Sequence, residues 1–280
     1  KLGTDGSWTY SMNTAHNEFK AGTVYTDSFT AKAADGTAQV VTVTINGTND
    51  AAVITGTSTP SLTQTVTALS ATGQLSATDI DNTAVNGGLF NVQSAVKGSS
   101  GYGNFSIDAT GKWTYVMNTA HDEFAAGVTY VDKLTVLTAD GTSQVITVNM
   151  VGTNDAAVIG GVSTAALVET NAILTAAGAL TITDVDNTAA FVPQTAVAGS
   201  GGYGKFSIDA TGKWTYATNT AHDEFVQGVT YTDSVTVSAV DGTTKVITVT
   251  MTGTNDAAVI GGVTTATLIE SNVAQTATGQ

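Results

Sequence analysis

The stretch GNFSIDATGKWTYVMNTAHDEFAAGVTY at residues 103–130 recurs almost unchanged as GKFSIDATGKWTYATNTAHDEFVQGVTY at residues 204–231. Apolar and aromatic residues alternate with polar ones around Trp113 and Tyr115, which is the two-residue period of a β-strand. The Asp-Ala-Thr-Gly at 108–111 separates two such runs and predicts a hairpin turn. We therefore expect antiparallel strands, with only the TAHDEF segment forming a short helical turn.

The same pattern marks an internal repeat. Trp8, Trp113 and Trp214 hold equivalent positions, and the octapeptide GTNDAAVI occurs three times, at 47–54, 152–159 and 253–260. The units differ in length only in the loop that begins at Asn82 in one unit and at Asn187 in the next, as expected for a surface loop on a fixed scaffold. A chain with such a period is built of tandem structural units.

Each unit contains about seven short strand patterns, and Asp-Gly pairs at 35–36, 140–141 and 241–242 predict tight hairpins with positive φ. This pattern favours an all-β fold of tandem immunoglobulin-like (cadherin-like) β-sandwich repeats of about 100 residues, without a disulfide. Cutting at the GTND joints predicts four segments. They are a carboxyl-terminal part of a repeat (1–50), two complete repeats (51–154 and 155–255) and an amino-terminal part of the next (256–280), so we expect a segment of a longer array.

Composition excludes several classes of protein. The chain has 23 acidic residues against nine basic ones, and a net charge of −14. Nucleic acid and anionic membranes are poor partners for such a chain, because they require Lys and Arg clusters. The apolar runs are too short to span a membrane. Cysteine is absent, which excludes disulfides and thiolate metal sites.

The acids recur in register and point to a hard cation. Each GTND joint supplies Asn and Asp, and an Asp-x-Asp-Asn cluster follows at 79–82 and 184–187. In an immunoglobulin-like sandwich these segments meet at one end, so Asp184 and Asp186 should approach Asp155, with Glu169 completing the shell. Ca²⁺ takes six to eight oxygen ligands, and the alternative interpretation is a solvated Asx turn. The predicted ligands are Asn49, Asp50, Asp79, Asp81, Asn82, Asn154, Asp155, Glu169, Asp184, Asp186, Asn187, Asn255, Asp256 and Glu270.

Other motifs carry weaker signals. His16, His121 and His222 could be metal ligands or catalytic groups, but a hydrogen-bonded structural His fits better, and no nucleophile motif accompanies them. The glycine-rich GSSGYG at 98–103 and GSGGYG at 199–204 mimic a dinucleotide fingerprint, yet each leads into a strand rather than a helix. We therefore expect no enzyme activity.

Two groups of core-facing residues leave alternatives open. Trp113 and Tyr115 fit a core better than a glycan-stacking platform. Asp27, Asp132 and Asp233 share a face with apolar neighbours, where an unpaired charge is costly. Either that strand end is hydrated, or the Asp caps the adjacent turn, or it reaches a calcium ion.

The segments GALTITDVDN at 178–187, YGKFSIDATGKWTY at 203–216, TDSVTVSAVDGT at 232–243 and VITVTMTGTNDAAVI at 246–260 resemble VCBS repeats. These occur in giant RTX-type bacterial adhesins, and the joint also resembles the calcium linker of cadherins. The resemblance covers essentially the whole chain. It implies Ca²⁺-dependent sandwiches, type I secretion to the cell surface, and a role as an adhesin extender in attachment or biofilm formation.

Two departures from the family pattern concern the joints. The Pro that usually follows the joint is Ala at positions 52, 157 and 258, which removes a fixed φ. Gln64 stands where Glu169 and Glu270 stand in later units, so we expect the first joint to hold its ion less tightly. The partners expected are neighbouring repeats of the same chain, with glycans or other cells contacted through the full-length protein. The alternative functions are glycan- or cell-binding repeats, or assembly into an extracellular filament.

Overall fold

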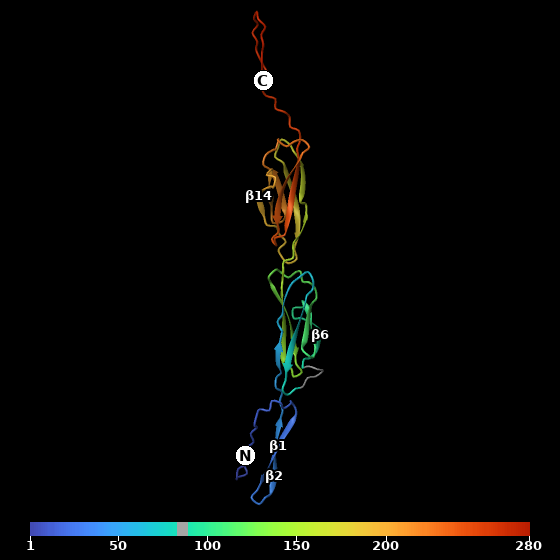
Figure 1. Cartoon of the computed structure of the whole chain (residues 1–280), viewed down its shortest axis with the longest axis vertical. Coiled ribbons are helices and arrows are strands. Elements are labelled where there is room, and N and C mark those ends of the chain that lie inside the picture. Colours follow the sequence, from blue (N-terminus) through green and yellow to red (C-terminus); the bar gives the residue numbers. More distant parts are fainter. Residues whose placement is uncertain (83–88) are drawn as a thin grey trace. The chain divides into compact units, whose positions relative to one another are not determined.

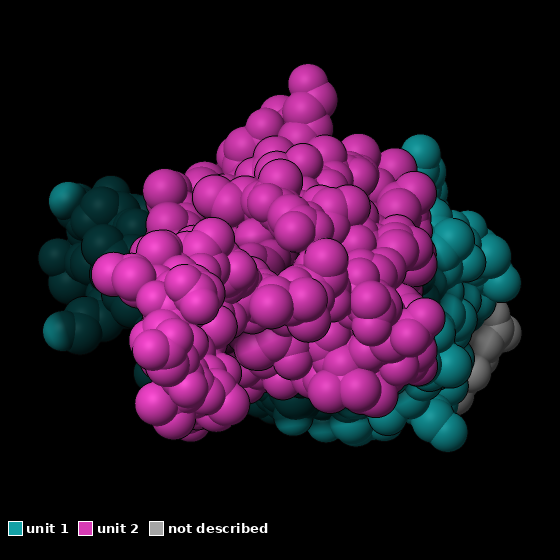
Figure 2. Space-filling model, turned by 90° about the horizontal axis from the view of Figure 1, so that it is seen from above, with its two compact units in different colours: residues 1–155 teal, residues 156–280 magenta. Residues whose placement is uncertain are grey.

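The computed structural model describes residues 1–82 and 89–280 and consists of β-strands joined by turns (Figure 1). The length-variable loop predicted from the sequence lies partly outside the described residues. Contacts divide the chain into two compact units, residues 1–155 and 156–280 (Figure 2). In the described part of the chain, no helix has the length and apolarity needed to cross a membrane.

The first unit contains a hairpin and a sandwich. The hairpin pairs strands β1 (Val24–Lys32) and β2 (Ala38–Asn46). In the sandwich, a five-stranded sheet has the order β3-β5-β8-β7-β6, and a three-stranded sheet has the order β4-β10-β9. The strands are β3 (Val53–Gly56), β4 (Ser61–Thr63), β5 (Ser70–Thr78), β6 (Gln93–Lys97), β7 (Gly103–Ile107), β8 (Lys112–Met117), β9 (Thr129–Leu137) and β10 (Ser143–Val151).

The second unit repeats the same sandwich. Its five-stranded sheet has the order β11-β13-β16-β15-β14, and its three-stranded sheet the order β12-β18-β17. The strands are β11 (Val158–Gly161), β12 (Thr164–Val168), β13 (Thr175–Thr183), β14 (Gln194–Ala198), β15 (Gly204–Ile208), β16 (Lys213–Thr218), β17 (Thr230–Ser238) and β18 (Thr244–Thr252). Residues 253–280 contain no regular strand. The predicted all-β fold of tandem sandwiches is confirmed, with one more strand per repeat than the sequence pattern indicated.

Each core lies between its two sheets, because the alternation of the strands turns every second side chain inward. Trp113 and Tyr115 are both 0% exposed, so the core interpretation is confirmed and the glycan platform is wrong for these residues. The Trp113 indole N–H donates to the Thr57 carbonyl at 2.8 Å. Gly73 is required beneath that ring, since a Cβ there would lie 2.4 Å from it. Trp214 and Gly178 repeat this arrangement in the second core.

The turns follow the sequence signals, with one correction. Gly111 and Gly141 have φ values of +86° and +91° in the two predicted hairpins of the first sandwich, a conformation that glycine adopts without strain. The TAHDEF segment was predicted as a short helical turn, but it forms a hydrogen-bonded turn without helical structure. The Phe124 amide donates to the His121 carbonyl at 3.0 Å, and His121 itself has a φ of +58°, which ends any helical path.

The sheet edges are short, bulged or covered. β3 and β4 are four and three residues long. β6 carries a bulge, because the register shifts between Gln93 and Val96, and Ala95 adopts a φ of +51° there. The outer edge of β9 is covered by connecting segments, with the Asn91 amide bonded to Leu137 O and the Ser99 amide bonded to Lys133 O. The second sandwich has the same bulge in β14.

Strand pairing fixes two ends of each sandwich. We call the end where β3 or β11 begins the amino-terminal pole, and the end where β10 or β18 finishes the carboxyl-terminal pole. β5 runs antiparallel to β3, which returns the loop after Thr78 to the amino-terminal pole. β4 runs parallel to β10, so the residue after Thr63 lies at the carboxyl-terminal pole. The second sandwich has the same pairings.

Candidate metal sites

Three acidic side chains converge at the carboxyl-terminal pole of the second sandwich. Glu169, Asp223 and Asp256 each place a carboxylate oxygen within 4.8 Å of the others, and within the described ranges this is the one group of three metal-ligating side chains so close together. Glu169 is 1% exposed. Its Oε2 accepts hydrogen bonds from the Thr254 amide at 2.9 Å and from the Thr254 hydroxyl at 2.7 Å.

The remaining oxygens of this cluster lack donors. Among the described residues, Glu169 Oε1 and Asp256 Oδ2 are buried without a hydrogen-bond partner. Burial, and then the charges of Glu169 and Asp223, raise the pKa of Asp256. A buried carboxylate oxygen without a donor is costly unless a cation or water binds it, so the cluster has the donor atoms of a cation site.

Gln64 occupies the equivalent position in the first sandwich. It is 4% exposed, and its Oε1 accepts the Thr153 amide at 3.0 Å, as Glu169 accepts the Thr254 amide. Its Nε2 donates to Asp155 Oδ2 at 3.0 Å. An amide therefore bonds to the joint aspartate at this pole, whereas a carboxylate faces it at the other.

A second acidic cluster lies at the amino-terminal pole of the first sandwich. The Asp50 amide donates to Asp81 Oδ2 at 3.3 Å, which places the joint beside the Asp-x-Asp loop as the sequence predicts. Asp79 Oδ1 accepts the Asp81 and Asn82 amides at 3.2 and 3.1 Å. Asp79 Oδ2 and Asp81 Oδ1 are buried without a partner in the described structure. Burial, and then contact with Asp81, raise the pKa of Asp79.

The second sandwich repeats this loop. Asp184 Oδ1 accepts the Asp186 and Asn187 amides at 3.2 and 2.9 Å. The Asn187 side-chain amide bonds to Asp186 Oδ2 at 3.2 Å. Asp184 Oδ2 is buried and, within residues 1–82 and 89–280, has no hydrogen-bond partner. The Asx turn expected as the alternative is therefore present. Among the described residues it leaves two buried carboxylate oxygens without a donor in the first loop, those of Asp79 and Asp81, and one in the second, that of Asp184.

The other predicted ligands have peripheral places. Asn49 and Asn255 are exposed and bond to the carbonyls of the following Asp50 and Asp256, at 3.1 and 3.2 Å. Asn154 is exposed, and so is Glu270, which lies in the strand-free segment after residue 253. The role of all fourteen predicted residues as metal ligands stays a prediction.

The placement of position 169 corrects one expectation. Glu169 lies at the carboxyl-terminal pole with Asp256, whereas Asp184 follows β13 at the amino-terminal pole. The physical reason is that β12 pairs in parallel with β18. Val168 lies beside Thr252 at the end of β18, so Glu169, the next residue, lies at the carboxyl-terminal pole. By the same pairing in the first sandwich, Gln64 contacts the joint at 153–155. The joint with the neutral residue is therefore the second, not the first.

Sequence reasoning also missed Asp223. It belongs to the TAHDEF segment, in which the His is the more conspicuous candidate ligand. This segment packs directly on the joint, because a Cβ at Gly253 would lie 2.9 Å from the carbonyl oxygen of Phe225, its last residue. The Gly that opens each GTND could have indicated this close approach, because glycine has no Cβ to prevent it.

The Ala that follows the first joint and the Ala that follows the second each donate a hydrogen bond from the backbone amide. The Ala52 amide donates to Asp140 Oδ2 at 3.0 Å and to the Thr142 hydroxyl oxygen at 3.1 Å. The Ala157 amide donates to Asp241 Oδ2 at 2.9 Å. Burial alone would raise the pKa of Asp140, but bonds from Thr138, Thr142 and the Ala52 amide outweigh it and hold that pKa well below its usual range. A proline at these positions has no N–H to donate.

We expect Ala52→Pro to destabilise the first sandwich by about 1–3 kcal/mol, because it leaves Asp140 with one donor fewer in a partly buried place. Equilibrium denaturation of the variant measures this change. Ala258→Pro is the matched control, since Ala258 is exposed and no strand adjoins it. Equal stability of Ala52→Pro and the unmodified chain would contradict the role of this hydrogen bond.

The backbone amides of each glycine-rich loop bind the carboxylate of a buried aspartate of the same sandwich. Asp132 is 0% exposed and accepts the amides of Ser100, Tyr102 and Gly103 at 2.8, 3.1 and 3.2 Å. A Cβ at Gly98 would lie 2.2 Å from the same carboxylate. Of the three alternatives for the core-facing aspartates, capping of an adjacent loop is therefore the correct one for Asp132.

Asp233 is held in the same way in the second sandwich. It is 0% exposed and accepts the Gly201 and Gly204 amides at 2.8 and 3.0 Å. Tyr216 donates its hydroxyl at 3.1 Å, as Tyr115 does to Asp132 at 3.2 Å. Burial, and then the Asp132 carboxylate, raise the pKa of Tyr115, so this hydroxyl stays a donor.

The histidines are structural. His121 bonds to Glu123 at 2.7 Å through Nδ1 and to the Tyr102 carbonyl at 2.9 Å through Nε2, and it stacks on Phe124. The Tyr102 ring, from the glycine-rich loop, packs edge-on against this stack. Both ring nitrogens of His121 are thus engaged within the protein, which disfavours a metal or catalytic role.

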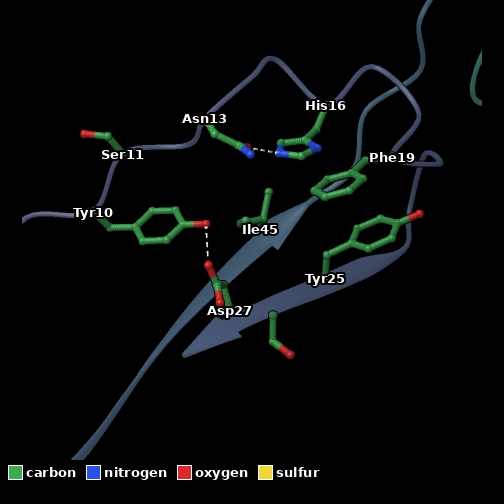
Figure 3. A pocket seen from close by; sticks show the side chains of 9 residues that line it. Tyr10, Ser11, Asn13, His16, Phe19, Tyr25, Asp27 and Ile45 are labelled. Atoms are coloured by element: carbon green, nitrogen blue, oxygen red, sulfur yellow. Dashed lines mark hydrogen bonds between the residues drawn. The ribbon is translucent and has the colours of Figure 1, made fainter. Parts of the chain in front are cut away.

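The segment at residues 1–50, which we call the hairpin unit, repeats several of these side chains. His16 stacks on Phe19, and the Tyr10 hydroxyl donates to Asp27 at 3.0 Å. These residues, with Tyr25, line an open pocket (Figure 3). Asp27 is exposed and accepts hydrogen bonds from the Tyr10 hydroxyl and the Ser28 amide.

The donor set at the poles fits a hard divalent cation. Among the described residues, the buried carboxylate oxygens without donors belong to Asp79, Asp81, Asp184, Glu169 and Asp256, while the amide oxygens of Gln93 and Gln194 also lack partners. Ca²⁺ prefers such ligands, together with carbonyls and water. The residues present therefore fit calcium, and one divalent ion would compensate charges that the protein's own donors leave unpaired.

Comparison with known proteins agrees with this fold. Residues 154–253 match the family model of the bacterial cadherin-like domain. With the sheet topology of both sandwiches, this match defines a chain of tandem cadherin-like β-sandwich domains.

Solved structures similar to the chain include three extracellular cadherin regions. The protocadherin GammaB4 extracellular domain is 14% identical, with a TM-score of 0.47 over 90% of this chain and 41% of that one. The human desmocollin-1 ectodomain is 14% identical, with a TM-score of 0.35 over 82% and 48%. Drosophila N-cadherin EC1-4 is 15% identical, with a TM-score of 0.29 over 90% and 64%. The chain spans less than two thirds of each, and no curated protein matches its sequence.

Proposed function

We propose that the chain consists of Ca²⁺-stiffened extender repeats of a large secreted bacterial surface adhesin. The repeats project a terminal ligand-binding region for attachment or biofilm formation. Residues 1–50, 51–154, 155–255 and 256–280 form successive parts of this array. Its partners are its own neighbouring repeats and, through the full-length protein, glycans or other cells. The VCBS-like sequence pattern and the bacterial cadherin-like match at residues 154–253 support this role.

One observation carries the calcium part of the proposal. Carboxylate oxygens of Asp79, Asp81, Asp184, Glu169 and Asp256 are buried without a donor in the described structure, and all lie at the poles of the sandwiches. Buried carboxylates keep their charge only when they are paired or coordinate a metal. A cation at each pole would hold the joint peptide against the loops beside it, as the Asp50–Asp81 contact already does in part.

The magnitudes allow calcium to control folding. Extracellular calcium modules bind with dissociation constants of about 10⁻⁴–10⁻³ M. At a free concentration of about 100 times that constant, each site adds about 2.7 kcal/mol to stability. Domains have a total stability of roughly 5–15 kcal/mol. The repeats would therefore be weakly folded in a calcium-poor cytosol, which suits export by type I secretion, and would become stable outside the cell.

We expect millimolar calcium to raise the melting temperature of the chain by at least several degrees over chelator, because the cation binds only the folded poles. Calorimetry at constant ionic strength measures this shift, with magnesium as the control, since its smaller ion demands tighter geometry. Small-angle scattering gives a second readout, in which chelator yields a smaller maximum dimension. Identical melting in calcium and chelator would overturn the calcium proposal, and an unchanged scattering dimension would overturn the stiffening.

A further inference from the structure

The two carboxyl-terminal poles differ at a single chemical position. In the second sandwich, Glu169 is 1% exposed, places Oε2 on the Thr254 amide and leaves Oε1 buried with no donor among the described residues. In the first sandwich, Gln64 places Oε1 on the Thr153 amide, and its Nε2 takes the place of the unpartnered oxygen. The unpartnered acceptor oxygen Oε1 of Glu169 is thus replaced by the donor nitrogen Nε2 of Gln64, and both side chains are buried.

The orientation of the Gln64 amide is determined by its surroundings. The Thr153 backbone N–H can only donate, so the atom that meets it must be the amide oxygen. The amide nitrogen then has to face Asp155, to which it donates at 3.0 Å. A flipped amide would set two donors against each other and two acceptors against each other. Gln64 is therefore held in the orientation that presents an N–H group, which cannot ligate a cation, to the joint.

At the second pole a carboxylate takes the place of this amide. Glu169, Asp223 and Asp256 bring three negative charges within 4.8 Å, and the oxygens of Glu169 and Asp256 that lack a donor are both buried. Like charges this close repel strongly unless a counter-charge lies between them. The first pole has Gln64 in place of one of these charges, and its joint aspartate already accepts a hydrogen bond.

We propose that the residue at position 64 or 169 determines whether a carboxyl-terminal pole needs a divalent cation: Glu169 forms a cation site with Asp223 and Asp256, and Gln64 replaces that cation with its own amide. The inference rests on the proposed calcium function and deepens it, because it makes the joints of one array unequal in their calcium requirement. A joint with Gln keeps its contact when calcium is scarce, whereas a joint with Glu loosens.

Two reciprocal variants test the proposal in the full chain. Glu169→Gln should bind one calcium ion fewer by isothermal titration calorimetry, and Gln64→Glu should bind one more. In chelator, Glu169→Gln should melt several degrees higher than the unmodified chain, because the introduced amide can donate to Asp256, and Gln64→Glu should melt lower. Hydrogen exchange at residues 61–66 should become calcium-dependent only in Gln64→Glu, and exchange at residues 165–170 should lose its calcium dependence in Glu169→Gln.

Asp5→Asn is the control for the loss of one charge, because Asp5 lies in an exposed turn and accepts hydrogen bonds from the Ser7 amide and hydroxyl. It should change neither stoichiometry nor exchange at the poles. If the unmodified chain responds to calcium but both variants keep its stoichiometry and its melting in chelator, the inference fails and the extender proposal stands. If the unmodified chain ignores calcium, the calcium part of the proposed function fails, and the inference that rests on it fails as well. Equal melting of Glu169→Gln and the unmodified chain in chelator also overturns the inference.

Discussion

Asp132→Asn is expected to lower the free energy of unfolding of the first sandwich by about 3–5 kcal/mol, because it leaves several buried donors without an acceptor, at about 1–3 kcal/mol each. The carboxylate is 0% exposed and accepts the amides of Ser100, Tyr102 and Gly103. An Asn side chain would turn an N–H₂ group toward one set of these donors. Because the loop, the Tyr115 hydroxyl and strand β9 all meet at this carboxylate, the substitution should loosen all three.

Hydrogen exchange in denaturant measures this loss separately for each sandwich. Asp233→Asn should produce the same loss in the second sandwich and leave the first unchanged. Asp27→Asn is the matched control, because Asp27 is exposed and its side chain contacts the Tyr10 hydroxyl and the Ser28 amide. We expect it to cost less than about 1 kcal/mol, as exposed substitutions usually do. An equal effect at positions 27 and 132 would show that the loop amides contribute nothing.

Trp113→Ala should destabilise the first sandwich by about 3–5 kcal/mol, as large-to-small substitutions of buried aromatic residues do. Trp113 is 0% exposed and rests on Gly73, so nothing nearby can fill the space that the ring leaves. Trp8 holds the equivalent place in the hairpin unit but is 46% exposed. Trp8→Ala should therefore cost only a fraction of that energy.

Hydrogen exchange in denaturant, followed at amides of residues 89–151, distinguishes these two variants without relying on the tryptophan that Trp113→Ala removes. The unfolding midpoint should shift strongly toward lower denaturant for Trp113→Ala and little for Trp8→Ala. Comparable shifts for the two would mean that the hairpin unit buries its aromatic residue as completely as the sandwich does. That result would contradict the exposures on which the prediction rests.

The fold was predictable because local and long-range signals agreed. The alternation around Trp113, the Gly of each Asp-Gly turn and the repetition of the whole pattern all indicate the same two-sheet unit. Aspartates in the apolar register were ambiguous for a physical reason. Asp132 is satisfied by backbone amides of the glycine-rich loop at residues 98–103, and backbone donors leave no mark in side-chain patterns.

The candidate sites were predictable in composition and less so in grouping. The approach of Asp50 to Asp81 follows from the order of the strands, and the structure shows it. The place of Glu169 depends on which sheet β12 joins. If β12 continued the pairing of β11 with β13, Glu169 would follow that sheet, but β12 pairs with β18 in the other sheet. The sequence from 158 to 168 is compatible with both. Asp223 was missed because its segment reaches the joint through backbone packing on Gly253 rather than through a residue pattern.

The shielding of the sheet edges has a consequence for the synthesis of such a protein. When nearly identical repeats are joined end to end, each folding repeat is close to the equivalent strands of its neighbour. This proximity favours exchange of strands between repeats. An open edge would accept a strand from the adjoining copy. Here β3 and β4 are short, β6 is bulged at Ala95, and β9 is covered by residues 89–99. Each repeat therefore completes its sheets with its own strands, so the repeats of a long array can fold one after another without exchanging strands.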